Sequence, residues 1–438
     1  MTQGDLIHRP AAAALAFLAV SVALIALRPL LPIDETRYLT VAWEMWQGGS
    51  RIVPHLNGEP YSDKPPVLFW LINLVWSVTG PAEFAARLVG PAAGAGAILL
   101  TARLAGALWP DAPDRPGQAA WVLATGGAFL AYGSATMFDT LLTVATLAAM
   151  LALWSMARRP GWRVSAALGA ALALGVLAKG PVILVHVLPV ALTFPLWRPE
   201  AAEARARDML AGVGLALVVA VALVGLWLGP ALVFGDAGYR NDILWRQSAG
   251  RMVASFAHDR PVWFFVALLP LFLWPWGWGR AAAGLWPRPI AAQERFLLAW
   301  AIGALTAFSL ISGKQIHYLL PELPALALLL SRGSVAAPGR WTRHLPLLPA
   351  LVVLGLGAAT ALNRGPDLLS GGVGLLELTL ASVIVGVAFV LVAMARSRRA
   401  ALAPVAPATL VAVLLIAFQT IWATNNPARL GSLLATFD

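Results

Sequence analysis

Cysteine and charge are both scarce in this sequence. The 438 residues include 0 cysteines, which excludes disulfide bonds, thiol catalysis and cysteine-ligated metals but does not identify the compartment. Only 12% of the residues are charged, whereas 59% are hydrophobic and the mean hydropathy is +0.76. A soluble core cannot enclose that much apolar surface. The composition therefore predicts an all-α polytopic membrane protein with roughly a dozen spans of about 20 residues each.

The apolar runs are long and are bounded by glycine, proline or charge. The first run is too long for a signal-peptide core and lacks a clear cleavage site, so it is interpreted as an uncleaved span. No internal repeat or low-complexity segment is found, and residues 1–438 are taken as a single transmembrane domain without a soluble C-terminal domain. The runs predict about 13 spans, at residues 10–31, 84–108, 118–136, 140–157, 163–178, 180–197, 209–230, 261–279, 295–312, 316–331, 345–362, 373–395 and 405–423.

The net charge of +10 favours basic cytoplasmic loops over a surface that binds nucleic acid. Most lysines and arginines lie in short loops between the predicted spans. When the loops are assigned alternately to the two sides of the membrane, the side that holds the N-terminus carries the larger share of them. This bias predicts a cytoplasmic N-terminus and an external C-terminus.

Two predicted external segments are longer than a simple turn, at about 32–83 and about 231–260. Within the first, residues 35–46 carry apolar side chains at helical spacing, and residues 66–79 are almost wholly apolar but too short to span. We expect both to form helices in the membrane interface. Between them stands "YSDKPP", in which an acid and a base precede two prolines.

Charged residues of both signs gather in these external segments and at the span ends beside them. Polar groups held at hydrocarbon depth are costly and usually mark a substrate path. Simpler interpretations exist: Asp34 and Asp139 each suit a helix start, as a cap or a partner of the helix dipole, and Lys179 suits a helix end. The wider set comprises Arg37, Tyr61, Asp63, Lys64, His258, Arg260, Lys314 and Tyr318.

In combination, these residue types fit one kind of substrate. Cations can hold a phosphate or pyrophosphate, and carboxylates can orient or deprotonate a hydroxyl. Apolar helices in the interface can bind a long lipid tail. A lipid phosphate that carries a sugar has all three parts.

The first external segment also resembles a known family. The stretch "DETRYLTVAWEMWQGGSRIVPHLNGEPYSDKPPVLFWL" is similar to the first external loop of the C-superfamily glycosyltransferases that use lipid-linked sugars. It is most similar to the bacterial aminoarabinose transferases of lipid A and to the protein O-mannosyltransferase group. Further matches follow in order over residues 10–330: "PAEFAARLVG" at 81–90, "FDT" at 138–140, "AKGP" at 178–181, "AHDRPVWFF" at 257–265 and "KQIHYLLPELPALALL" at 314–329.

The resemblance implies a GT-C type enzyme of the bacterial inner membrane. It would move a sugar from an undecaprenyl-phosphate-type carrier to a periplasmic acceptor, which is a lipid A-like glycolipid, another glycan or a protein. The implied catalytic carboxylates are Asp34 and Asp139, and direct displacement predicts inversion at the anomeric carbon. The implied contacts to the donor phosphate and lipid carrier are Arg37, Tyr61, Lys64, Lys179, Arg260, Lys314 and Tyr318.

Three questions stay open at this stage. Asp63 and His258 occupy the positions where relatives hold a metal, but two ligands alone make a weak site, so a divalent metal cofactor is left undecided. Many relatives continue into a soluble outer domain that this sequence lacks, which leaves the acceptor and the sugar undefined; the chain is expected to act as a monomer. The alternative function is a polyprenyl-lipid flippase or transporter, which would carry charges deep within its spans.

Overall fold

The computed structural model describes residues 9–27, 30–31, 33–244, 260–274, 276–278, 280–286 and 289–333. The last three predicted spans, at 345–362, 373–395 and 405–423, lie outside these residues, as does His258. The described elements are α2 (Pro10–Leu27), α3 (Asp34–Trp46), β1 (His55–Leu56), β2 (Glu59–Pro60), α4 (Val67–Thr79), α5 (Glu83–Arg87), α6 (Val89–Leu108), α7 (Arg115–Ala124), α8 (Gly127–Gly133), α9 (Phe138–Arg158), α10 (Trp162–Lys179), α11 (Ile183–Leu192), α12 (Phe194–Trp197), α13 (Ala206–Phe234), α14 (Ala237–Asn241), α16 (Phe264–Phe272), η2 (Trp276–Trp278), η3 (Arg280–Leu285), α17 (Ala292–Leu310), η4 (Ile316–Glu322) and α18 (Leu323–Leu330).

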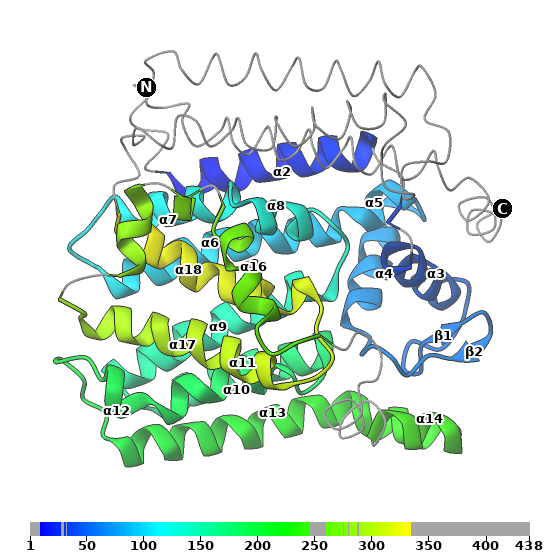
Figure 1. Ribbon diagram of the computed structural model, residues 1–438. Helices are drawn as coiled ribbons and strands as arrows, with labels where there is room; N and C mark the ends of the chain where they lie inside the picture. Colours follow the sequence, from blue (N-terminus) through cyan, green and yellow to red (C-terminus); the bar gives the residue numbers. More distant parts are fainter. Residues whose placement is uncertain are drawn as a thin grey trace, which may run out of the picture.

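Long apolar helices dominate this part of the chain. Four described helical stretches are long and apolar enough to cross a membrane: Glu83–Leu108, Phe138–Arg158, Trp162–Lys179 and Ala206–Phe234. Because a helix satisfies its backbone hydrogen bonds internally, it is the structure that such runs adopt in lipid. In Figure 1 the long helices lie side by side along one direction, with α2 along one edge of the bundle and α13 along the opposite edge. The expected helical, polytopic architecture is confirmed, but the count of 13 spans is not.

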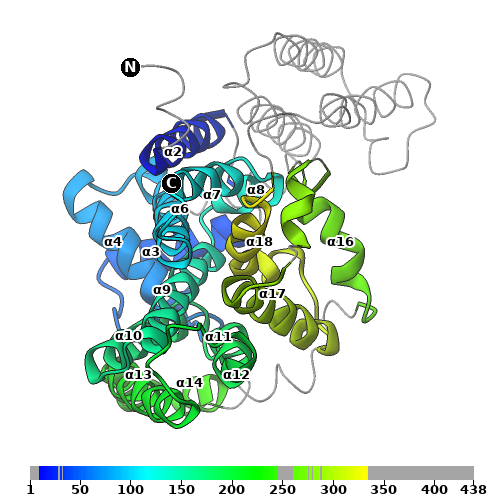
Figure 2. The same ribbon diagram turned by 90° about the vertical axis from the view of Figure 1, so that its left-hand side faces the viewer.

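The bundle has a clear centre and rim. Seen end-on in Figure 2, α9 lies between α6 and α10, and α13 packs on the far side of α10. In the most apolar window of α9, 78% of the residues are buried within the protein, against 17% in that of α13. Helix α13 therefore presents a broad face of leucine and valine that is suited to lipid.

One predicted span is broken in the structure. Residues 118–136 form two helices, α7 and α8, which are separated at Thr125 and Gly126. The break coincides with contacts from a distant segment: the Gly127 N–H donates to the carbonyl of Trp274 over 3.0 Å, and the Trp276 indole donates to the Thr125 hydroxyl over 2.9 Å. A second predicted span, 261–279, is helical only over α16 and then continues as the 3₁₀ turn η2.

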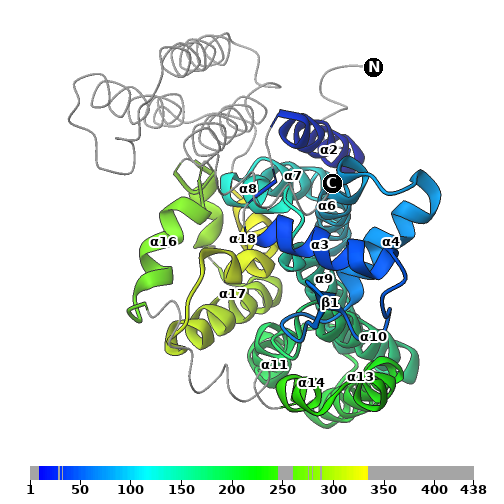
Figure 3. The same ribbon diagram turned by 90° about the vertical axis from the view of Figure 1, so that its right-hand side faces the viewer.

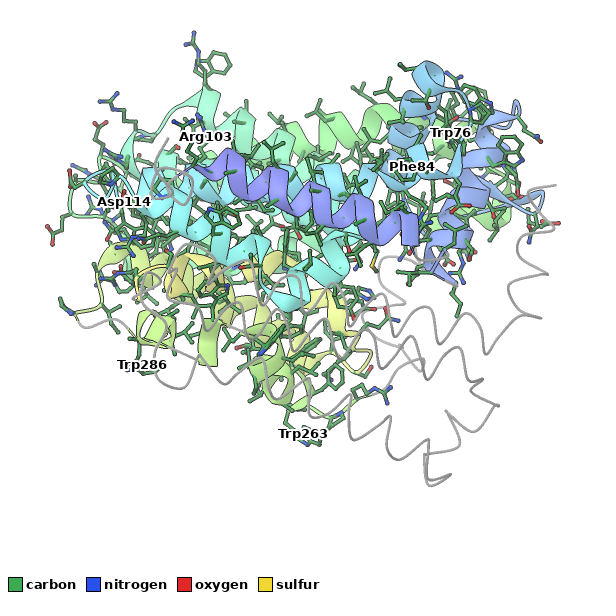
Figure 4. All side chains as sticks on the ribbon, turned by 90° about the horizontal axis from the view of Figure 1, so that it is seen from above. Trp76, Phe84, Arg103, Asp114, Trp263 and Trp286 are labelled. Atoms are coloured by element: carbon green, nitrogen blue, oxygen red, sulfur yellow. The ribbon has the colours of Figure 1, made fainter. Side chains whose placement is uncertain are left out.

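A small layer covers one end of the bundle. It consists of α3, α4, α5 and a two-stranded hairpin, which gather at the right of Figure 1; Figure 3 looks directly onto this layer, where α3 crosses in front of α9. In Figure 4, Trp76 and Phe84 mark this end, whereas Arg103 and Asp114 mark the opposite end. Helix α3 packs on α4, and the buried Asn73 amide of α4 donates to the Ala42 carbonyl of α3 over 2.9 Å.

The hairpin is the one departure from an all-helical fold in the described residues. Strands β1 and β2 pair antiparallel, and Asn57 and Gly58 form the turn with φ angles of 55° and 80°. Such angles suit an Asn-Gly turn between short strands. Glu44 of α3 fixes this turn, because its carboxylate accepts hydrogen bonds from the backbone N–H groups of both Asn57 and Gly58. Nothing in the sequence singled out Glu44 for this role.

Candidate active site

Asp34 and Tyr38 lie one turn apart on α3, the helix that crosses the end of the bundle. The helix begins at Asp34, and the cap position belongs to Ile33, whose φ of 74° is rare for a β-branched residue. Asp34 is therefore not the helix cap that its position suggested. Its half-buried carboxylate instead accepts a hydrogen bond from the Tyr38 hydroxyl over 3.0 Å.

Tyr38 stands among several acidic groups. Burial raises the pKa of its phenol well above the usual value near 10, and the charges of Asp34, Tyr61 and Asp139 and the hydrogen bond to Asp34 raise that pKa further. The phenol is therefore protonated at any physiological pH and is a hydrogen-bond donor. Asp34, Tyr61 and Asp139, which come from three different segments, thus all act electrostatically on this side chain.

Asp139 occupies the first turn of α9 and is only 3% exposed. Its Oδ1 accepts a short ion-pair hydrogen bond from the Lys179 ammonium, and His317 Nε2 lies 3.9 Å from its Oδ2. The preceding residue, Phe138, packs edge-on against Tyr38 with ring centroids 4.8 Å apart. The charge of Lys64 also acts on Asp139 and His317. The carboxylate is thus paired with Lys179 and lies beside His317, while the residue before it packs against Tyr38 of α3.

Lys179 ends α10 in a way that its own sequence dictates. Gly180 follows with φ of 82°, a left-handed conformation that favours glycine, and Pro181 cannot continue the helix. The "AKGP" motif therefore stops α10 with Lys179 directed at Asp139. The Lys179 ammonium also lies 4.8 Å from the ring centroid of Tyr318, within the range of a cation–π contact.

His317 is held between two tyrosines. Its ring centroid lies 5.8 Å from that of Tyr132 on α8 and 5.2 Å from that of Tyr318. Through η4, the "KQIHY" motif thus meets the "FDT" and "AKGP" motifs around Asp139. Sequence reasoning named His317 only as a member of its motif, and the tertiary contacts place it beside the buried carboxylate.

Lys314 and Arg260 contact each other rather than this carboxylate. The buried Lys314 ammonium donates to the Arg260 carbonyl over 2.8 Å, and the Arg260 N–H donates to Ser312 over 3.2 Å. Arg37 is half-buried on α3, three residues after Asp34. Asp63 is half-buried in the loop before α4, and among the described residues no three histidine, aspartate or glutamate side chains form a group that could hold a metal.

Glu35 is the principal residue of the site to which sequence reasoning gave no role. It is 0% exposed, accepts hydrogen bonds from the N–H groups of Leu31 and Thr136, each over 2.9 Å, and lies 3.8 Å from Nη2 of Arg87. It therefore joins the start of α3 to the loop that leads into Asp139. The available signal was a charge pair within the matched motifs, since Glu35 belongs to "DETRY" and Arg87 to "EFAARL".

The fold defines the class of protein. Over 93% of this chain and 77% of the other, it superposes on the crystal structure of ArnT from Cupriavidus metallidurans bound to undecaprenyl phosphate, with a TM-score of 0.73 and 20% sequence identity. It also superposes on the apo oligosaccharyltransferase of Archaeoglobus fulgidus, with a TM-score of 0.54 and 13% identity over 94% of this chain and 56% of the other. This is the membrane-helical fold of the C-superfamily glycosyltransferases.

Sequence comparisons identify the family. The family model described as dolichyl-phosphate-mannose-protein mannosyltransferase matches residues 63–227. A protein of Pectobacterium carotovorum subsp. carotovorum, named undecaprenyl phosphate-alpha-4-amino-4-deoxy-L-arabinose arabinosyl transferase, is 31% identical over 415 residues, which are 86% of this chain and 71% of that protein. The chain belongs to this aminoarabinose transferase family. A protein of the same name from Pseudomonas aeruginosa (strain LESB58) is 33% identical over 79% of this chain, and the match spans only 60% of that relative's length.

Proposed function

We propose that this chain is an inner-membrane glycosyltransferase that takes a sugar from an undecaprenyl-phosphate-type carrier. The names of the family members and the undecaprenyl phosphate bound to ArnT support a lipid-linked donor. The observation that carries the proposal is the cluster around Asp139, where Lys179, His317 and the Tyr38–Asp34 pair meet at one end of the membrane bundle. The comparisons give no support to the alternative of a polyprenyl-lipid flippase.

The cations of the cluster would act on the leaving group. As the bond between the anomeric carbon and the phosphate oxygen breaks, its electron pair passes to the phosphate, and nearby cations stabilise the added charge. Lys179 and Lys64 are the cations of this cluster that we propose for this role. Arg37 on α3 is proposed as a third cation that contacts the phosphate. The buried Asp139 would keep the Lys179 ammonium in one position before the donor arrives, which lowers the cost of organising it during the reaction.

Asp34 would act on the acceptor. It is half-buried, whereas Asp139 is almost fully buried and paired, so Asp34 is the more accessible carboxylate. An acceptor hydroxyl would attack the anomeric carbon and pass its proton to Asp34, with Tyr38 fixing the position of the carboxylate through its hydrogen bond. Attack opposite the departing phosphate inverts the anomeric configuration. An acceptor phosphate would need no base, and Asp34 would then only position it.

The remaining parts of the proposal concern the surroundings of the site. The distribution of basic residues supports a cytoplasmic N-terminus. The segments at 32–83 and 231–260 and the active site are accordingly proposed to face the periplasm. The acceptor is a glycolipid, another glycan or a protein. Tyr61, Arg260, Lys314 and Tyr318 remain proposed contacts of the lipid-phosphate donor, and the chain is proposed to act as a monomer without nucleic acid. Asp63 and His258 are too few to define a metal site, and no step of the reaction is assigned to a metal.

The test is transfer from a labelled undecaprenyl-phosphate sugar in membranes that contain Asp34→Asn. We expect the rate to fall by roughly 10²- to 10⁴-fold, the usual effect of losing a positioned base. Asp111→Asn, an exposed acid at the opposite end of the bundle, is the matched control and should transfer at the wild-type rate. Wild-type transfer by Asp34→Asn would exclude the catalytic role of Asp34. Lys64→Ala should raise the apparent KM for the donor, and an unchanged KM would exclude its phosphate contact.

A further inference from the structure

A second pair of ionisable side chains lies buried in the bundle, outside the cluster described above. His186 of α11 and Glu322 of η4 are 0% and 3% exposed, and His186 Nδ1 lies 2.5 Å from Glu322 Oε1. Buried acids and imidazoles are costly unless they are paired, so a pair in an apolar core needs a reason. The proposed transfer reaction makes no use of either residue.

The pair joins the two segments that furnish the cluster around Asp139. Lys179 is the last residue of α10, and His186 follows seven residues later in α11, beyond the turn at Gly180. His317 is near the start of η4, and Glu322 is its last residue. The two segments therefore meet twice, once through the groups that surround Asp139 and once through the His186–Glu322 hydrogen bond.

A chain of ring contacts connects the pair to the cluster. The His186 ring centroid lies 5.1 Å from that of Phe308 on α17, and the Phe308 centroid lies 5.9 Å from that of Tyr318. Tyr318 in turn lies against the Lys179 ammonium and the His317 ring. A displacement of His186 would therefore also displace Tyr318, through the packed ring of Phe308 as well as through η4.

The geometry of η4 explains why it needs a tertiary contact such as the His186–Glu322 hydrogen bond, called the tie below. It is a 3₁₀ helix of 7 residues with Pro321 inside it, whereas 3₁₀ runs longer than about four residues are uncommon because their hydrogen bonds are poorly aligned. Pro321 also removes one backbone donor. The local sequence thus gives η4 little stability of its own, and the angle at which it presents His317 and Tyr318 must be fixed by tertiary contacts.

We propose that His186 and Glu322 are positioning residues, which hold η4 against α11 and thereby set His317 and Tyr318 beside Asp139 and Lys179. This proposal rests on the transferase function proposed above. The pair touches neither the donor nor the acceptor, and it acts only through the residues at the other end of η4. Loss of the His186–Glu322 hydrogen bond changes the placement of His317 and Tyr318. It therefore lowers the rate of transfer, while the protein still folds.

The decisive comparison uses two buried acids. Glu322→Leu removes the tie, and Glu294→Leu is the matched control: Glu294 is likewise buried, at 0% exposed, and is paired with Arg332 over 2.6 Å. The Glu294–Arg332 pair lies toward the end of the bundle opposite the active site. Arg332 follows Ser331, whose carbonyl accepts a hydrogen bond from Arg115, and Arg115 follows Asp114, which marks that end in Figure 4. Both variants should lower the melting temperature. Only Glu322→Leu should lower kcat by roughly tenfold or more at a temperature where both are folded, as expected for a displaced active-site group.

Two further measurements separate positioning from general stability. Glu322→Gln keeps an oxygen that accepts from His186 and should restore kcat to within about threefold of wild type. Glu322→Leu added to a variant that carries both His317→Ala and Tyr318→Ala should slow it no further, to within about twofold, because the tie acts only through these two side chains. If Glu322→Leu does not accumulate in membranes, His186→Phe carries the same expectations, since it keeps a ring against Phe308 but cannot form the hydrogen bond.

The proposal is overturned if Glu294→Leu loses as much kcat as Glu322→Leu, or if the effect of Glu322→Leu multiplies with that of the variant that carries both His317→Ala and Tyr318→Ala. A wild-type protein that transfers no sugar from the labelled donor would refute the proposed function instead. The affinity for undecaprenyl phosphate itself would then decide the positioning role. Affinity weakened by roughly fivefold in Glu322→Leu but not in Glu294→Leu would support it, and equal affinities would exclude it.

Discussion

Replacing Glu35 by glutamine should disturb the site without touching any group assigned to the reaction. The Glu35 carboxylate accepts from the backbone N–H groups of Leu31 and Thr136 and lies 3.8 Å from Arg87. A glutamine has one carbonyl oxygen, so its NH₂ group would face one of the two backbone donors. One buried N–H is then unsatisfied, which costs about 1–3 kcal/mol, and Arg87 loses one of the two carboxylate partners that the described residues give it. The expected total is about 2–4 kcal/mol.

Glu83→Gln is the matched control, because it removes a second carboxylate that contacts the same arginine in the described part of the chain. Glu83 lies 2.9 Å from Arg87 Nη1, but its side chain is 45% exposed, so this half of the interaction is worth roughly 0–1 kcal/mol. The change in unfolding is measurable from intrinsic fluorescence, since the chain has 19 tryptophans. At roughly 2 °C per kcal/mol, Glu35→Gln should lower the melting temperature in detergent by about 4–8 °C, and Glu83→Gln by about 2 °C or less.

The same substitution should slow transfer. Glu35 links the first turn of α3 to Thr136, which lies three residues before Asp139, so its loss shifts Asp34 relative to Asp139. A displacement of about 1 Å can cost up to roughly 10²-fold in rate, and we expect a decrease of about 10- to 100-fold in labelled-sugar transfer. Equal melting temperatures and equal rates for Glu35→Gln and Glu83→Gln would refute this account of the link.

Three further outcomes are expected. Asp139→Asn should reduce transfer by roughly 10²-fold or more, because the half-buried Lys179 cation loses its carboxylate partner; a rate within twofold of wild type would argue against the ion pair. Gly180→Ala should cost about 1–2 kcal/mol at its φ of 82° and misplace Lys179, so melting temperature and rate should fall together, and a stabilised, active variant would contradict this. Because the Tyr38 pKa is raised, its protonated form contributes stability that is fully present below pH ~10 and is lost only at still higher pH. Tyr38→Phe should therefore lower stability by roughly 1 kcal/mol at pH 7, because the hydrogen bond to Asp34 is lost. It should leave the pH dependence of the transfer rate unchanged between about pH 6 and 9. If the wild-type rate changes at alkaline pH and this change disappears in Tyr38→Phe, the reasoning is wrong.

The sequence located most of the long helices because the membrane leaves the backbone little choice. The span predicted at 140–157 is α9 (Phe138–Arg158), and the one predicted at 163–178 is α10 (Trp162–Lys179). An apolar run of this length has to satisfy its own hydrogen bonds, and helix is the local solution. The end of α10 at Lys179 is likewise determined by the local sequence, because a glycine followed by a proline ends a helix.

The same local logic failed where distant segments compete for the backbone. The run at 118–136 was predicted as one span, yet it breaks between α7 and α8, where the Trp274 carbonyl accepts a hydrogen bond from Gly127 and the Trp276 indole donates to Thr125. Hydropathy records the solvent that a segment prefers, and it carries no information on which remote side chain will supply a hydrogen bond.

The sequence by itself determined the helical membrane architecture, the family and the residue types of the site. Only the tertiary structure decided the partners: Asp139 pairs with Lys179 and lies beside His317, whereas Lys314 donates to the Arg260 carbonyl. It also revealed the partners of Glu35 and the pairing of His186 with Glu322. The physical reason is that periodicity fixes the backbone over one helix, whereas a buried charge finds its partner through the packing of whole helices, which only the folded chain contains.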